Sequence, residues 1–135
     1  NILIHEDLNI ELCDFGGFNV ELNDNDSKDF TLRYAAPEVV KNQNITKAID
    51  IWSFGLVLYD IFYLKQPWLG LTSEQIVDGL KRDKTPLNKS LDEDPTPVQI
   101  INLIKKCVNS DYKQRPKINE ILDEIIRIIY ELNIV

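Results

Sequence analysis

The chain has 135 residues, of which 44% are hydrophobic and 27% are charged, a composition typical of one soluble globular domain or of part of one. Its 22 acidic and 15 basic side chains give a formal net charge of −7, which argues against nucleic acid or an anionic membrane surface as a partner, because both attract basic proteins. Two cysteines, and no basic segment followed by an apolar stretch at the start, favour a cytoplasmic location. Methionine is absent even at position 1, so we expect the sequence to be a piece of a longer chain.

The first predicted element is a β-hairpin. Short apolar runs at residues 2–4 and 10–13 flank a polar turn at residues 5–9. Residues 16–31 then predict a polar loop, because the acids and asparagines at its centre can bury little surface. An isolated hairpin is only marginally stable, so this one must pack on the helices or on a part that is missing from this chain.

Helices are predicted for most of the remaining chain. Pro37 suits the first position of a short helix over residues 37–40. Residues 47–64 are apolar on nearly every face, which predicts a helix buried along the axis of the domain. The sequence Thr-Ser-Glu-Gln at residues 72–75 has the form of a capping box and predicts a helix that reaches about residue 82.

Two more helices complete the predicted fold. Residues 96–99, Thr-Pro-Val-Gln, predict a second capping box with proline at the first helical position, and Pro116 opens the last helix. One hairpin followed by about five helices predicts an α+β fold that is mainly α-helical. The apolar stripe of the last helix follows helical spacing and consists of Ile118, Ile121, Leu122, Ile125, Ile128, Ile129 and Leu132.

Several short motifs follow one another in order along this scaffold. Asn1 precedes the triplet Asp14-Phe15-Gly16, and the triplet Ala36-Pro37-Glu38 comes next. The stretch "DIWSFGLVLYDI" lies on the predicted buried helix, and "CVNSDYKQRP" leads into the last helix. A single tripeptide of this kind arises often by chance, whereas an ordered set that covers the whole chain does not.

In these motifs the chain resembles the C-terminal lobe of eukaryotic protein kinases. Residues 1–4 resemble the end of the catalytic loop, and the two triplets resemble the D-F-G and A-P-E motifs. The two longer stretches are most similar to the tyrosine-kinase-like group of Ser/Thr kinases. The resemblance implies that residues 1–135 are a partial kinase domain, which runs from the end of the catalytic loop to the last helix. It contains the hairpin, the activation segment and about five helices, and the N-lobe is absent from this chain.

The resemblance implies a site for ATP and magnesium (Mg²⁺) at the hairpin. Asp14 would supply a carboxylate and Asn1 an amide oxygen to the metal, which prefers oxygen ligands. Gly16 would permit the sharp turn after the aspartate. Leu3 resembles the apolar floor under adenine. Cys13 would line the same pocket, although a small buried hydrophobic residue is an equally good interpretation of this cysteine.

Three further residues resemble the structural framework of the family. Glu38 and Arg115 would form a buried ion pair that belongs to the architecture rather than to the chemistry. Asp50 resembles an aspartate that accepts hydrogen bonds from amides of the catalytic loop, which lie before Asn1. Trp52 and Trp68 are interpreted as packing residues.

The activation segment of the family bears on substrate choice. Thr31 stands where Ser/Thr kinases have a threonine whose hydroxyl reaches the catalytic aspartate and shapes the acceptor site. Phe30 takes the place of the usual glycine, which alters the expected geometry of this loop, and Tyr34 resembles a residue beside the acceptor pocket. Ser27 and Thr31 are candidate phosphorylation sites, with a solvated loop serine as the alternative for Ser27.

Two functions remain open on this reading. The first is an ATP-dependent protein kinase that transfers phosphate to Ser or Thr of a protein substrate and is truncated here. The second is a non-catalytic, pseudokinase-like module that binds other proteins. The family's catalytic-base aspartate lies five residues before the position of Asn1. The sequence contains neither His-Arg-Asp nor Gly-x-Gly-x-x-Gly, so the 135-residue chain alone is predicted to be inactive.

Overall fold

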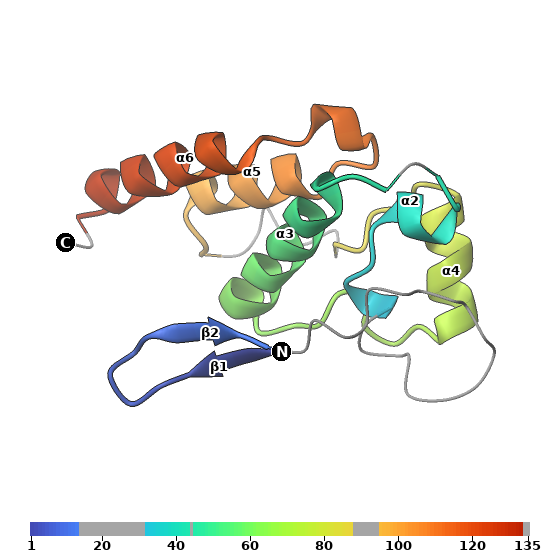
Figure 1. The fold of residues 1–135 in the computed structure, drawn as a ribbon, viewed down its shortest axis with the longest axis horizontal. Coiled ribbons are helices and arrows are strands. Elements are labelled where there is room, and N and C mark those ends of the chain that lie inside the picture. Colours follow the sequence, from blue (N-terminus) through green and yellow to red (C-terminus); the bar gives the residue numbers. More distant parts are fainter. Residues whose placement is uncertain (14–31, 44, 88–94, 134–135) are drawn as a thin grey trace.

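A computed structural model describes residues 1–13, 32–43, 45–87 and 95–133. Within these residues the fold is mainly helical, with one two-stranded antiparallel sheet and five α-helices (Figure 1). The elements are β1 (Ile2–Ile4), β2 (Ile10–Leu12), α2 (Pro37–Val40), α3 (Ala48–Tyr63), α4 (Ser73–Lys81), α5 (Val98–Cys107), the 3-10 helix η3 (Tyr112–Gln114) and α6 (Ile118–Glu131). The predicted activation segment falls mostly outside the described residues.

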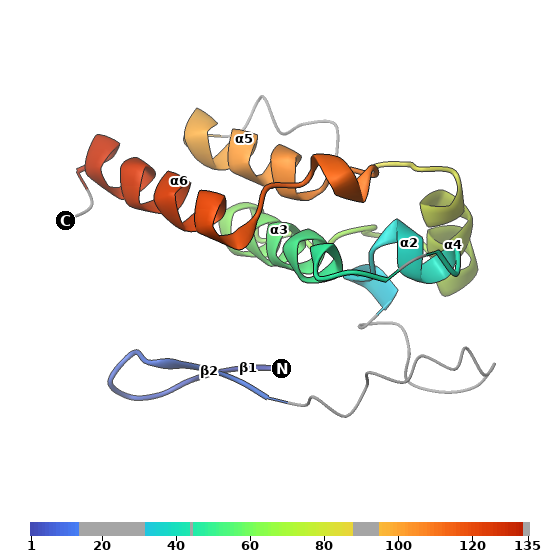
Figure 2. The ribbon, with the colours of Figure 1, turned by 45° about the horizontal axis from the view of Figure 1, so that its top comes forward.

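The hairpin forms as its sequence pattern predicts. Ile2 pairs with Leu12 and Ile4 with Ile10, in antiparallel register. The polar turn closes through the amide of His5, which donates to the carbonyl oxygen of residue 9 at 2.9 Å. In both views the hairpin lies on the opposite side of α3 from α6 (Figures 1 and 2).

The core is built around α3, which packs against α5. Trp52, Leu56 and Tyr59 of α3 are almost completely buried. The two helices approach closely at Gly55, where a Cβ atom would lie 2.6 Å from the Cβ of Cys107. A glycine at this position therefore sets the distance between the two central helices, and the packing role predicted for Trp52 agrees with its burial.

The prediction that residues 47–64 form a buried axial helix is wrong at the C-terminal end of α3. Ile61, Phe62 and the following residue Leu64 are exposed. The helix ends at Tyr63, and the next residue, Leu64, has a left-handed backbone with φ 50°. Composition predicts how much apolar surface a helix carries, but the neighbouring elements decide which part of that surface is covered, and no described element covers this part.

The helix starts differ in how well the sequence predicts them. At α4 the hydroxyl oxygen of Thr72 accepts from the amide of Gln75 at 3.3 Å, and the Gln75 side-chain oxygen accepts from the Thr72 amide at 3.0 Å, as expected for a capping box. The prediction that Pro97 takes the first helical position is wrong, because α5 begins at Val98 and Pro97 is the residue before it. The Gln99 side chain donates to Glu131 on α6 at 3.2 Å.

The last helix is present but uses only part of its predicted stripe. It begins two residues after Pro116, where the Lys117 amide donates to the Glu120 carboxylate at 2.6 Å. Ile121 and Ile128 are buried, whereas Ile118 and Leu122 are exposed. Among the helices that the structure describes, none has the length and apolar character needed to cross a membrane.

Candidate functional site

The hairpin brings three of the predicted site residues to one face. The Cys13 amide donates to the carbonyl oxygen of Asn1 at 3.0 Å, so these residues lie opposite each other at the open end of the hairpin. Leu3 pairs with Glu11 two positions further along. Because directly paired side chains point to the same face and the faces alternate along a strand, Asn1, Leu3 and Cys13 share a face. The opposite face carries Ile2, Ile4, Ile10 and Leu12.

Glu11 joins this face and was missed by the sequence reasoning. Its carboxylate oxygen lies 3.0 Å from Nε2 of His5, and both side chains are exposed. An exposed pair of this kind adds little stability, since both groups remain in water. The register of the hairpin is the signal that identifies Glu11, because a shift of one residue would have placed it on the other face.

The remaining predicted residues of this site lie outside the described part of the chain. These are Asp14 and Gly16, which follow the hairpin, and Ser27 and Thr31 of the predicted activation segment. Among the described residues, no group of three or more His, Cys, Asp or Glu side chains is placed to hold a metal ion. The described part of the site therefore offers the amide of Asn1 and the apolar surface of Leu3, next to the strand end at Cys13.

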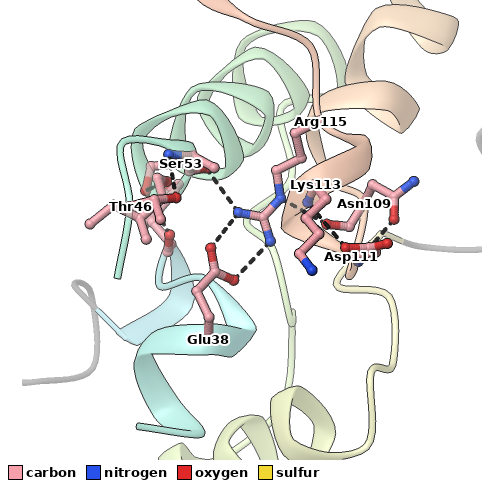
Figure 3. Close-up of polar contacts among 10 residues, drawn as sticks. Glu38, Thr46, Ser53, Asn109, Asp111, Lys113 and Arg115 are labelled. Carbon is pink, nitrogen blue, oxygen red and sulfur yellow. Dashed lines mark hydrogen bonds and ion pairs between the residues drawn. The ribbon is translucent and has the colours of Figure 1, made fainter. Parts of the chain in front are cut away.

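Glu38 on α2 and Arg115 before α6 meet in the interior (Figure 3). Two parallel hydrogen bonds join them, Nη1 to Oε1 at 2.6 Å and Nη2 to Oε2 at 2.8 Å, and the residues are 1% and 7% exposed. Arg115 also donates to the carbonyl oxygens of Asn109 and Ala48, both at 2.8 Å. Its guanidinium lies 5.0 Å from the centre of the Trp52 ring. Each of the two buried charges therefore has a counter-charge and hydrogen-bond partners, without which its burial would be costly.

Asp50 is placed differently from the buried pair. It lies in the first turn of α3, and its side chain is exposed. Within the described residues the Asp50 carboxylate makes no hydrogen bond or ion pair. Its position at a helix N-terminus is favourable for a negative charge. The predicted role of Asp50 as an acceptor for catalytic-loop amides stays a prediction.

The segment before α2 is held to the helical body by two neighbouring side chains. Arg33 donates to three carbonyl oxygens of the loop after α3, those of Pro67 at 3.2 Å, Trp68 at 2.8 Å and Leu71 at 3.2 Å. Three bonds from one planar guanidinium fix both segments in one arrangement. No local sequence signal predicts these contacts, because the partners are more than thirty positions apart.

Tyr34 forms the second anchor. Its hydroxyl donates to the Asp60 carboxylate on α3 at 2.6 Å, and its carbonyl oxygen accepts from the Ser53 hydroxyl at 2.9 Å. Burial, and then the hydrogen bond and charge of Asp60, raise the pKa of Tyr34 to about 12. The segment that follows Thr31 in sequence is thus fixed against α3 by a neutral tyrosine.

Two cavities lie away from the hairpin. One cavity, of about 540 Å³, lies between α5 and α6 and is lined mainly by polar and charged side chains, including Lys106 and Glu124. The second, of about 440 Å³, lies beside Trp68 and α4. Neither includes a residue of the predicted site.

Comparison with known proteins identifies the family. The sequence-family model that describes the protein kinase domain matches residues 1–125 of this chain. The chain is 36% identical over 131 residues to dual specificity protein kinase pyk3 of Dictyostelium discoideum, covering 93% of this chain and 9% of that protein. It is 30% identical over 124 residues to mitogen-activated protein kinase kinase kinase dlk-1 of Caenorhabditis briggsae, covering 90% of this chain and 14% of that protein.

A third relative is Activated Cdc42 kinase-like of Drosophila melanogaster, with 29% identity over 140 residues, 93% of this chain and 10% of that protein. The chain spans about a tenth of the length of these three relatives. The ordered motifs, the helical fold with its buried Glu38–Arg115 pair and the match over residues 1–125 agree with one another. The chain belongs to the protein kinase family.

Proposed function

We propose that this chain carries the metal-binding and adenine-binding part of an ATP-dependent protein kinase that phosphorylates Ser or Thr residues of protein substrates. The observation that supports the proposal most directly is the register of the hairpin. It places Asn1, Leu3 and Cys13 on one face, with Asp14 next in the sequence. In this proposal residues 1–135 form the part of the kinase domain from the end of the catalytic loop to the last helix.

The donor set suits the proposed ligands. Asn1 and Asp14 would hold Mg²⁺, a hard cation that takes amide and carboxylate oxygens. When bound, the metal supplies positive charge that neutralises the phosphates of ATP. Leu3 would support the adenine ring and Cys13 would line the pocket beside it. These residues bind and orient the nucleotide, which is the main task of the protein in phosphoryl transfer.

Ser/Thr specificity is proposed from Thr31, whose hydroxyl would shape the acceptor site. The next described residues are fixed by Arg33 and Tyr34, so a substrate hydroxyl would meet a firmly supported segment. The relative pyk3 bears the name of a dual specificity kinase. Identification of the phosphorylated residues in the substrate therefore distinguishes Ser/Thr specificity from the alternative, phosphorylation of tyrosine.

The isolated chain is proposed to be inactive, because the catalytic base and the residues that clamp the phosphates are expected before Asn1. We also propose a cytoplasmic protein that acts on protein substrates, without nucleic acid or membrane partners. Ser27 and Thr31 are its proposed phosphorylation sites.

The test compares the isolated chain with the polypeptide encoded by its complete reading frame. We expect calorimetric titration to show Mg-ATP binding by the complete polypeptide only, together with phosphate transfer to Ser or Thr of a mixed protein substrate. Asp14→Ala should abolish both, whereas Asp78→Asn, an exposed carboxylate change on α4, should leave both unchanged. Absence of Mg-ATP binding by the complete polypeptide would favour the non-catalytic interaction module. Phosphate transfer by the isolated chain would contradict its proposed inactivity.

A further inference from the structure

The guanidinium of Arg33 binds a loop from a distant part of the chain. Its Nη1 donates to the carbonyl oxygens of Pro67 at 3.2 Å and Trp68 at 2.8 Å, and its Nη2 donates to that of Leu71 at 3.2 Å. The arginine side chain is partly buried in this contact. Because all three carbonyl oxygens converge on one planar cation, its removal would take a donor from each of them at once.

Residues 68–71 form the turn that presents two of these oxygens. The Leu71 amide donates to the Trp68 carbonyl oxygen at 3.0 Å and closes the turn, and Gly70 at the third position has φ 80°. This is the pattern of a type II turn, which favours glycine there. Trp68 has φ 57°, a conformation that is costly for a bulky residue. Arg33 therefore donates to both ends of a turn that is held in a demanding conformation.

Arg33 also belongs to the segment that bears on the acceptor site in the proposed function. It follows Thr31 by two residues and directly precedes Tyr34, whose hydroxyl donates to Asp60 on α3 at 2.6 Å. The tyrosine ties this segment to α3, and the arginine ties it to the turn. Such attachment matters for group transfer, because a misplacement of about 1 Å can cost on the order of 100-fold in rate.

We propose that Arg33 is a positioning residue for the protein substrate and that it acts through the turn at residues 68–71. This inference rests on the proposed function and adds to it the element that sets the place of the acceptor segment. None of the three partners of Arg33 belongs to the hairpin that is proposed to hold Mg-ATP. Loss of the guanidinium should therefore weaken the use of the protein substrate and leave the use of Mg-ATP unchanged.

The test uses the polypeptide encoded by the complete reading frame. Initial rates of phosphate transfer give the KM for the mixed protein substrate and, separately, the KM for Mg-ATP. Arg33→Met keeps the length of the side chain and removes its donors, so it should raise the protein-substrate KM about tenfold. The Mg-ATP KM should stay the same. Arg82→Met, which changes an exposed arginine after α4, is the matched control and should alter neither KM.

Substitutions at Gly70 test whether the effect passes through the turn. A Cβ atom at this position would meet no atom within 4 Å, so Gly70→Ala strains only the backbone. It should raise the protein-substrate KM as Arg33→Met does. Gly70→Asn should have a smaller effect, because asparagine adopts a positive φ more readily. In the double variant Arg33→Met, Gly70→Ala the two effects should not add, since both act on one unit.

The outcomes separate this inference from the proposed function. A complete polypeptide that transfers no phosphate overturns both. An unchanged protein-substrate KM in Arg33→Met, or an equal rise in the Mg-ATP KM, overturns the inference alone. A purely structural role belongs to the first of these results, because a smaller folded fraction lowers kcat and leaves both KM values unchanged. Additive effects at Arg33 and Gly70 overturn the role of the turn.

Discussion

Tyr34 and Asp60 join two distant segments through a hydrogen bond of 2.6 Å, in which the phenol donates to the carboxylate. The tyrosine lies just before α2 and the aspartate near the end of α3. The bond requires a neutral phenol, because a phenolate beside a carboxylate would bring two negative charges together. This contact fixes the chain between the predicted activation segment and the core.

Stability should fall at high pH because of this tyrosine. Its pKa in the folded chain is about 12, above the ordinary value of 10.0, so its contribution is fully present below pH 10 and is lost as the pH rises through 12. Urea unfolding at pH 9 and at pH 11 measures the loss. Tyr34→Phe should unfold more easily at pH 9 by about 0.5–1.5 kcal/mol and should show a smaller loss between the two pH values. An equal loss in both proteins would show that another group is responsible.

Removal of one member of the buried Glu38–Arg115 pair should be strongly destabilising. We expect Glu38→Gln to lower the free energy of unfolding by about 3–5 kcal/mol, because the guanidinium would stay buried without its counter-charge. Chemical denaturation measures the change. The control is Arg82→Ala, which breaks the exposed Arg82–Asp78 pair and should cost no more than about 0.5 kcal/mol. Comparable losses in the two variants would mean that burial of the first pair has no special effect.

Gly55→Ala should destabilise the chain although alanine is the better helix former. The added Cβ would lie 2.6 Å from the Cβ of Cys107 and 2.8 Å from a methyl group of Val108, so α3 and α5 would have to separate. Overpacking of this kind costs about 1–3 kcal/mol. The gain in helix propensity from glycine to alanine is about 1 kcal/mol, so a cost in the upper part of the overpacking range exceeds it. The melting temperature should therefore fall. An unchanged or higher melting temperature would show that α5 can move aside at little cost.

The two cysteines should differ in reactivity. Burial, followed by the charge of Glu124, raises the pKa of Cys107 to about 12, whereas Cys13 is partly exposed at the end of the hairpin. At pH 8 a brief treatment with iodoacetamide should modify Cys13 and leave Cys107 intact, since the thiolate is the reactive form. Mass spectrometry of the peptides identifies the labelled residue. Both should react in urea, and early labelling of Cys107 without urea would contradict its burial.

Local signals in the sequence predict the fold well where both partners are close together. The Thr72–Gln75 capping box needs only residues three positions apart, and it forms as expected. For α5 the same kind of pattern predicts the helix start less well, because Pro97 lies before the helix rather than at its first position, and the Gln99 side chain has a partner on α6. For α3 and α6 the sequence predicts the helices but not which apolar side chains stay exposed, since coverage depends on other elements.

The candidate site shows the same division. The resemblance to protein kinases was sufficient to predict that Asn1 and Leu3 belong to one site, and the register of the hairpin also identifies Glu11. Arg33 and Asp60 were not predicted, because their partners lie 26 to 38 positions away and nothing local marks them. Contacts of this range follow from packing, which a short motif does not encode.

The ion pair between Glu38 and Arg115 also has a consequence for the order of events during synthesis. Its two members are 77 positions apart, so α2 leaves the ribosome long before its counter-charge exists. Until Arg115 emerges, the glutamate must remain hydrated, and the nascent chain cannot lock α2 against its neighbours. The docking of α2 is therefore postponed until the last helix is being translated. A ribosome stalled between the two residues would hold an incompletely packed chain that chaperones can bind.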